Sequence, residues 1–101
     1  MLGLMGIATK AGKVAFGTEA VIETIEKKKS KLVVIAEDAS DKAKDNMTYV
    51  CNKNQIPIAV FGTIETISKA IGKTNKAVIS IKDKNLGEEI YKIICGGEAI
   101  G

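Results

Sequence analysis

The sequence of 101 residues contains no histidine, no arginine and no tryptophan. Without histidine there is no imidazole to serve as a general base near neutral pH, and no histidine ligand for a metal ion. Without arginine, all fifteen basic residues are lysines. Lysine is a flexible point charge that suits phosphate, whereas the rigid fork of arginine suits guanine. Any contact with nucleic acid should therefore be mainly electrostatic, although the lysines could equally serve solubility alone.

Cysteines and long apolar runs are also scarce. Cys51 and Cys95 have no metal-like spacing and no base partner, so we expect buried or half-buried free thiols in a reducing cytosol. Residues 1–8 are apolar but too few to span a bilayer, and no secretory leader is recognisable. We therefore expect a cytoplasmic protein that makes no membrane contact, with residues 1–8 in a core-facing helix.

Catalytic and metal-binding motifs are poorly represented. Gly72-Lys73-Thr74 imitates the end of a P-loop, but the motif needs a second glycine where Ile67 stands. The acidic pair Glu37-Asp38 follows a predicted strand, where a receiver domain would hold magnesium. A receiver needs a further aspartate after a later strand, at the place of Phe61-Gly62. The alternative is that the acidic pair begins a solvated turn. We therefore expect no enzyme, no metal site, no cofactor and no small-molecule substrate.

The apolar pattern predicts helices alternating with strands. An apolar fraction of 46% in a chain of this length indicates one domain over residues 1–101. Residues 32–36 are continuously apolar, which is typical of a strand covered on both faces, and hence of a three-layer α/β/α sandwich. The predicted helices are 2–10, 18–28, a helix from the N-cap Ser40 to Asn54, 64–71 and 83–95, the predicted strands are 13–16, 32–36, 56–61 and 77–81, and the tail from Gly96-Gly97 should fray.

Residues 10–20 combine a basic turn, a short strand and a glycine that opens a helix. Gly17-Thr18 occupies the place of an N-cap. A helix start presents unpaired N–H groups and a partial positive charge, which suit an anion. Lysines stand before the glycine and close the same unit, at positions 10, 13, 27–29 and 31. This pattern predicts an anion-binding helix start or, as the alternative, a capped surface helix with solvated lysines.

Four segments together resemble the kink-turn-binding ribosomal protein superfamily, and in particular its short bacterial members. The segments are residues 16–19, 31–39, 56–58 and 68–73, and the resemblance runs from about Gly3 to Ile94. It implies an α/β/α sandwich with a four-stranded mixed sheet and a non-enzymatic function in binding structured RNA.

The resemblance also implies two RNA contacts. Members of the superfamily use a helix start with glycine, any residue, asparagine, glutamate, two residues and lysine. Gly17 and Thr18 match, while Glu19, Ala20 and Glu23 replace the asparagine, glutamate and lysine. Glu19 can still accept from guanine N–H groups or can simply favour the helix dipole; Ala20 makes no such bond, and Glu23 repels phosphate.

The second implied contact is the loop over residues 60–64, which packs against an extruded nucleotide in the superfamily. Phe61 could stack on a base, or could instead complete the core. Gly17→Val is expected to block RNA while leaving the fold intact. The expected RNA-binding residues are Lys13, Phe16, Gly17, Thr18, Glu19, Lys28, Lys31, Phe61, Gly62, Thr63 and Ile64.

These observations lead to two hypotheses of different classes. The first is a binder of structured RNA, such as ribosomal RNA or a kink-turn-like element, with the ribosome as a possible partner. The second is a protein–protein interaction module on the same fold, which has lost kink-turn recognition through the replacements at positions 19, 20 and 23.

Overall fold

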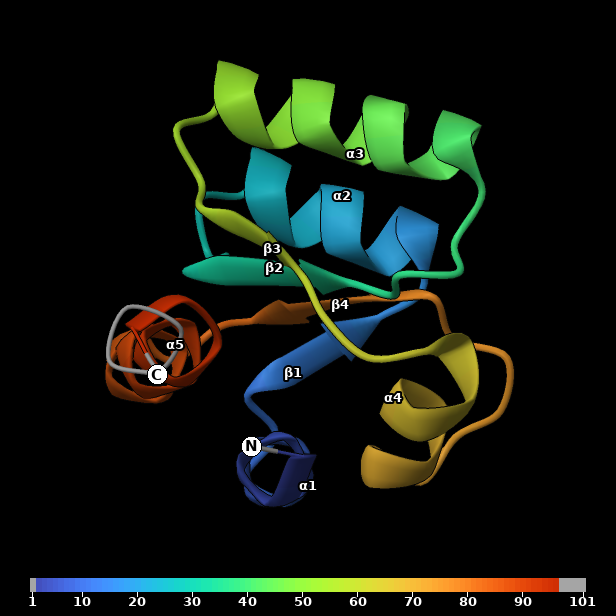
Figure 1. Cartoon of the computed structure of the whole chain (residues 1–101). Helices are drawn as coiled ribbons and strands as arrows, with labels where there is room; N and C mark the ends of the chain where they lie inside the picture. The colour runs from blue at the N-terminus through green and yellow to red at the C-terminus, as the bar shows by residue number, and fades with distance from the viewer. Residues whose placement is uncertain (1, 97–101) are drawn as a thin grey trace.

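A computed structural model gives the structure of the protein, and it describes residues 2–96. Helices and strands alternate along this part of the chain (Figure 1). The elements are α1 (Leu2–Lys10), β1 (Val14–Phe16), α2 (Thr18–Glu26), β2 (Leu32–Ile35), α3 (Asp41–Lys53), β3 (Ile58–Val60), α4 (Ile64–Ala70), β4 (Val78–Ile81), α5 (Lys84–Tyr91) and a π-helical turn η1 (Lys92–Gly96).

The four strands form one mixed sheet in the order β1-β4-β2-β3. β4 is antiparallel to β1 and to β2, and β2 is parallel to β3. Helices α2 and α3 cover one face of the sheet, and α1, α4 and α5 cover the other (Figure 1). This arrangement confirms the predicted three-layer α/β/α sandwich with a four-stranded mixed sheet.

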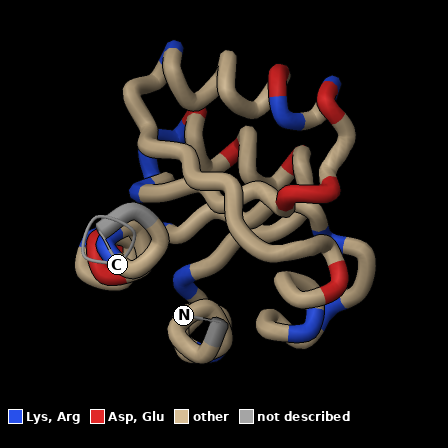
Figure 2. The backbone as a smooth tube through the Cα atoms, in the orientation of Figure 1, with Lys and Arg blue, Asp and Glu red and all other residues tan. Residues whose placement is uncertain are grey.

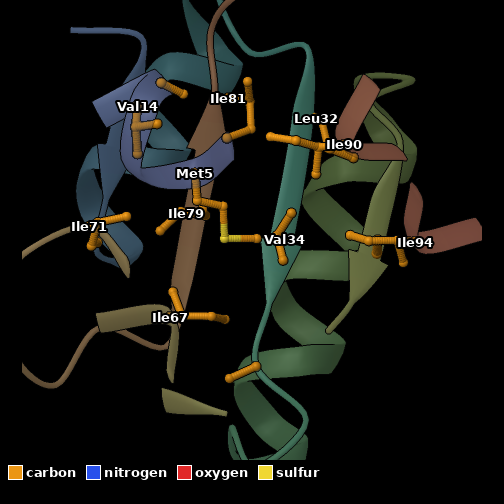
Figure 3. Packing of buried hydrophobic residues seen from close by; sticks show 13 residues of the cluster. Met5, Val14, Leu32, Val34, Ile67, Ile71, Ile79, Ile81, Ile90 and Ile94 are labelled. Atoms are coloured by element: carbon orange, nitrogen blue, oxygen red, sulfur yellow. The ribbon is translucent and has the colours of Figure 1, made fainter. Parts of the chain in front are cut away.

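The continuous apolar run of β2 is explained by burial on both faces. Leu32 and Val34 point into the cluster that includes Met5 and Ile90 (Figure 3), whereas Val33 and Ile35 belong to the cluster beneath α2 and α3. Side chains alternate between the faces of a strand, so β2, which lies between two helical layers, buries all four of its side chains.

The strand directions define two edges of the sheet. β1, β2 and β3 end, and β4 begins, at what we call the carboxyl edge, which comprises residues 16–20, 37–40, 61–64 and 73–77. At the opposite amino edge, β1, β2 and β3 begin and β4 ends. The amino edge comprises residues 13, 27–31, 56–57 and 82–84. α2 and α4 therefore both begin at the carboxyl edge.

Some element boundaries differ from the prediction. The strand expected over residues 56–61 is only Ile58–Val60, following Pro57, whose carbonyl accepts from Val33 N at 3.0 Å. Helix α2 ends at Glu26, before Lys28, whose φ of 60° is in the left-handed region. The helix expected over 83–95 divides into α5 and η1, with Asp83 as N-cap.

The predicted strands 13–16, 32–36 and 77–81 are each one residue shorter, as Val14–Phe16, Leu32–Ile35 and Val78–Ile81. Gly96 ends η1, and the rest of the tail that was expected to fray lies outside the described residues. Within residues 2–96, no helix is both long and apolar enough to cross a membrane.

Candidate functional site

Gly17 sets the geometry at the start of α2. Its N–H donates to the carbonyl of Val78 at 3.0 Å, which fixes the end of β1 against β4. Gly17 is the N-cap with φ 91° and ψ 151°, and no side chain caps the helix. The first N–H groups of α2 are therefore left without a side-chain partner and are available to an anion.

This backbone conformation also corrects one expectation. The φ and ψ of Gly17 lie in a region that is essentially restricted to glycine. A Cβ at this position would be strained even though its nearest neighbour, Lys76 Nζ, is 4.0 Å away. Gly17→Val therefore perturbs the backbone as well as the approach of a ligand, and it is not the neutral probe of binding that the sequence suggested.

A shallow hollow of about 350 Å³ lies over the start of α2. Phe16, Gly17, Thr18, Glu19 and Ala20 line it together with Lys76. Thr18, Glu19 and Ala20 are exposed, whereas Phe16 and Gly17 are partly buried. Four of the expected residues, at positions 16–19, thus share one surface.

Two lysines that were not among the expected RNA-binding residues stand at this hollow. Lys73 Nζ lies 5.0 Å from the centroid of the Phe16 ring, and Lys76 Nζ lies 5.7 Å from it. The backbone N–H of Lys76 donates to Ser68 Oγ at 2.7 Å, which fixes the loop after α4. The helix start therefore acquires its positive charge from a segment about sixty residues further along the chain.

The pairing of β1 with β4 brings these lysines into place. Phe16 pairs with Ile79, so the residues before β4 must lie beside the residues after β1. A prediction that β1 and β4 are antiparallel neighbours could have revealed Lys73 and Lys76, but the order of strands is not encoded in local apolar periodicity.

The expected second contact forms the neighbouring part of the carboxyl edge. Phe61 and Ile64 are partly buried and pack against the core cluster, so the ring of Phe61 contributes to the core and keeps part of its surface exposed. Gly62 has a φ of 70°, and its carbonyl accepts from Glu37 N at 2.7 Å. Thr63 caps α4 in a reciprocal capping box with Thr66.

A second hollow, of about 410 Å³, joins this loop to the lysines. Asp38, Ile64, Lys69 and Lys73 contribute to its lining. Lys73 thus lies between the hollow at the start of α4 and the ring of Phe16 at the start of α2. Lys73 is therefore the residue that links the two expected contacts along the carboxyl edge.

Three expected residues lie elsewhere. Lys13, Lys28 and Lys31 are exposed at the amino edge. The nine residues of α2 span roughly 14 Å at 1.5 Å per residue, so Lys28 is separated from Gly17 by the length of the helix. The structure therefore does not bring these three lysines together with the helix start.

The replaced motif positions are open to solvent. Glu19, Ala20 and Glu23 are exposed. Glu23 Oε1 accepts from Lys27 Nζ at 3.1 Å, one turn further along α2. This ion pair is exposed and contributes at most about 1 kcal/mol, so it does not fix Glu23 firmly in place.

The acidic pair has a structural role in the fold. Asp38 Oδ1 accepts from the N–H of Ile64 at 2.8 Å, which ties the loop after β2 to the start of α4. Among residues 2–96, no group of three or more His, Cys, Asp or Glu side chains gathers as it would around a metal ion.

Gly72-Lys73-Thr74 follows helix α4 and precedes β4, which is not the arrangement of a P-loop.

The sandwich is that of a known class of protein. The chain belongs to the Ribosomal protein L7Ae/L30e/S12e/Gadd45 family, which it matches over residues 1–91. This membership confirms the resemblance found in the sequence.

Individual proteins that are similar to this chain agree with the family assignment. The chain is 29% identical to the RNA-binding protein YlxQ of Bacillus subtilis over 90% of its own length and 91% of that protein. It is 34% identical to the large ribosomal subunit protein eL8 of Thermoplasma volcanium over 92% of its length and 78% of that protein. A solved structure of a protein with unknown function from Bacillus halodurans has a TM-score of 0.89 at 30% identity, covering 92% of this chain and 94% of that one.

Proposed function

We propose that this protein is a non-enzymatic binder of structured RNA, either ribosomal RNA or a kink-turn-like element, and that it acts in the cytoplasm, with the ribosome as one setting. The observation that carries the proposal is the uncapped start of α2 with Lys73 and Lys76 beside it. Relatives that carry the names RNA-binding protein and large ribosomal subunit protein support it.

The chemistry of the carboxyl edge suits such a ligand. The free N–H groups of α2 and the two ammonium groups attract phosphate. Gly17 carries no side chain that would hold a sugar-phosphate backbone away. The partly exposed ring of Phe61 and the neighbouring Ile64 offer apolar surface to a base that leaves the stack.

The three replaced positions make a standard kink-turn a poor ligand. Ala20 cannot accept from a base, and the carboxylate of Glu23 points into solvent near the helix start. A carboxylate in place of a lysine removes an attraction and adds a repulsion. We therefore propose binding of a standard kink-turn at micromolar order or weaker, or a preference for another RNA fold.

The double variant Lys73→Gln with Lys76→Gln tests the location of the site. Binding to a kink-turn hairpin should weaken about tenfold or more, because two phosphate partners are lost. A plot of log affinity against log salt should start from a slope of about −2 to −4 and become shallower by about 2. A filter-binding or fluorescence titration at several salt concentrations measures both quantities.

Lys10→Gln with Lys53→Gln is the matched control, because it removes two lysines from the last turns of α1 and α3, which lead towards the amino edge and away from the start of α2. The control should bind almost as well as the wild type. If the Lys73/Lys76 variant binds with unchanged affinity and slope, the carboxyl edge is not the binding surface. Capture of a protein partner that survives ribonuclease treatment, without RNA binding, would favour the interaction-module hypothesis.

A further inference from the structure

A second concentration of positive charge lies at the amino edge, away from the start of α2. Figure 2 shows blue segments over residues 27–31, where β2 begins, and at the start of β1. Three chain segments contribute to this surface, which we call the lysine edge. Its members are Lys13, Lys28, Lys29, Lys31, Lys82 and Lys84.

Backbone hydrogen bonds hold these segments next to one another. Lys82 N donates to the carbonyl of Lys13 at 2.7 Å, and Lys31 N donates to the carbonyl of Ile81 at 2.7 Å. Within residues 2–96, Lys27 is the one lysine that forms an ion pair, with Glu23. The lysine edge therefore carries charge that neighbouring carboxylates do not neutralise directly.

A hollow of about 420 Å³ opens beside this charge. Lys31, Lys84, Glu88 and Tyr91 line it together with Pro57 and Gly87. A Cβ on Gly87 would stand 3.3 Å from the Cβ of Lys31, so the glycine lets α5 lie close to the beginning of β2. Tyr91 is 41% exposed, and it lines the hollow together with Lys31 and Lys84.

A tyrosine and two lysines around one hollow offer the chemistry that single-stranded RNA requires. Unstacked bases stack on aromatic rings, and the strand's phosphates are held by positive charge. A duplex keeps its bases stacked and would leave the hollow unused. The absence of arginine favours contacts with phosphate over base-specific contacts.

The backbone conformation of Lys28 is unusual for a lysine. Its φ of 60° lies in the region that favours glycine, and the turn that it occupies is closed by Lys29 N donating to Thr24 O at 2.8 Å. A lysine is thus present where the backbone alone would favour a glycine. Lys28→Gly is consequently a variant that removes a charge without a stability penalty.

We propose that the lysine edge is a second RNA-binding surface, which holds a single-stranded segment adjoining the structured element bound at the carboxyl edge. Lys31 and Lys84 contact phosphates, and Tyr91 stacks on a base. The proposal rests on the proposed function for its first RNA contact, but the lysine edge itself can be tested separately.

The experiment compares three RNAs: a kink-turn hairpin, the same hairpin with a single-stranded oligouridine tail, and the free oligouridine. For the wild type, the tail should tighten binding by about tenfold, and each engaged phosphate of the single strand should steepen the salt slope by about 0.7. The free oligouridine should bind weakly and should lose its binding as salt rises.

The test variant is Lys28→Gly with Lys31→Gln and Lys84→Gln. It should lose the gain from the tail while binding the bare hairpin as the wild type does. The control, Gln55→Gly with Lys42→Gln, relieves the same kind of backbone conformation at φ 59° and removes a lysine outside the lysine edge. The control should keep the gain. Tyr91→Leu should reduce the gain, and Tyr91→Phe should preserve it.

Each outcome supports or overturns the proposal. A tail that adds nothing overturns it, and so does a test variant that weakens the bare hairpin and the tailed hairpin equally. A fourth RNA, the same hairpin with a duplex extension in place of the tail, tests the assignment to single strands, and an equal gain from it overturns that assignment. If the wild type binds neither the bare hairpin nor ribosomal RNA, the proposed function fails. Free oligouridine binding that is lost in the test variant would then still support the lysine edge.

Discussion

Three residues in the first turns of α2 carry the difference between this chain and the kink-turn motif of its superfamily. Glu19, Ala20 and Glu23 are all exposed, so their side chains can be exchanged without repacking the core. Glu23 also accepts from Lys27 at 3.1 Å. Each exchange is therefore expected to change recognition far more than it changes the stability of the fold.

The variant Glu19→Asn, Ala20→Glu and Glu23→Lys should tighten kink-turn binding by about a hundredfold or more. Restored hydrogen bonding to a base is worth roughly 1–3 kcal/mol, and replacing a repulsive carboxylate with a lysine contributes about 1–3 kcal/mol. About 1.4 kcal/mol corresponds to a factor of ten. Titration of both proteins against one kink-turn RNA measures the change, with a G·A-disrupted RNA as control.

The loss of the ion pair between Glu23 and Lys27 costs only a few tenths of a kcal/mol of helix stability, so the triple variant should remain folded. A wild type that already binds at nanomolar affinity, without gain in the triple variant, would show that the three replacements are harmless. The base contacts would then have to be sought elsewhere on the carboxyl edge.

At the scale of elements, features that depend on neighbouring residues were predicted correctly from the sequence. The continuous apolar run of β2 and the N-cap of α3, where Ala43 N donates to Ser40 Oγ at 3.1 Å, are both present. Strand order is set by long-range pairing, so the sequence analysis grouped Lys28 and Lys31 with Gly17 and missed Lys73 and Lys76. Lys28 lies a helix length away from Gly17, although the two are close in sequence. Lys73 is distant in sequence but lies beside Phe16.

The loop between β2 and α3 is tied to α4 by one carboxylate. Asp38 Oδ1 accepts from Ile64 N at 2.8 Å, in addition to the Thr63 capping box. Asp38→Ala should therefore cost about 0.5–2 kcal/mol, as the loss of a helix-capping carboxylate does. The melting temperature should fall by about 4–8 °C for each kcal/mol lost.

Thermal unfolding with and without magnesium measures this effect, with Asp45→Ala on the exposed side of α3 as the matched carboxylate control. The control should melt close to the wild type, and magnesium should change none of the three. Stabilisation of the wild type by magnesium that disappears in Asp38→Ala would instead support the acidic pair as a metal site.

For the whole molecule, two apolar clusters share one sheet. Cys51 lies in the cluster beneath α3 and α2, with 0% of its surface exposed, and it is a free thiol as expected. Because β2 contributes to both clusters, a charge that forms beneath α3 should affect the unfolding of the entire molecule. Burial raises the pKa of the Cys51 thiol from 9.0 to about 11.

The free energy of unfolding should therefore fall as the pH rises from about 9 to about 11. Below about pH 9 the thiol is protonated in both states, so its contribution is fully present. Between about pH 9 and 11 the unfolded chain releases the proton that the folded chain retains. Unfolding then becomes more favourable by at most about 1.4 kcal/mol per pH unit.

Urea unfolding across this interval tests the effect when the wild type is compared with Cys51→Ala. The variant should be less stable near neutral pH because truncation leaves a cavity, but its stability should fall less steeply towards alkaline pH. The two proteins share every ionisable group except this thiol, so the difference between the two slopes isolates its contribution. Parallel slopes would mean that Cys51 ionises in the folded state as readily as in the unfolded state, and that the layer beneath α3 opens without global unfolding.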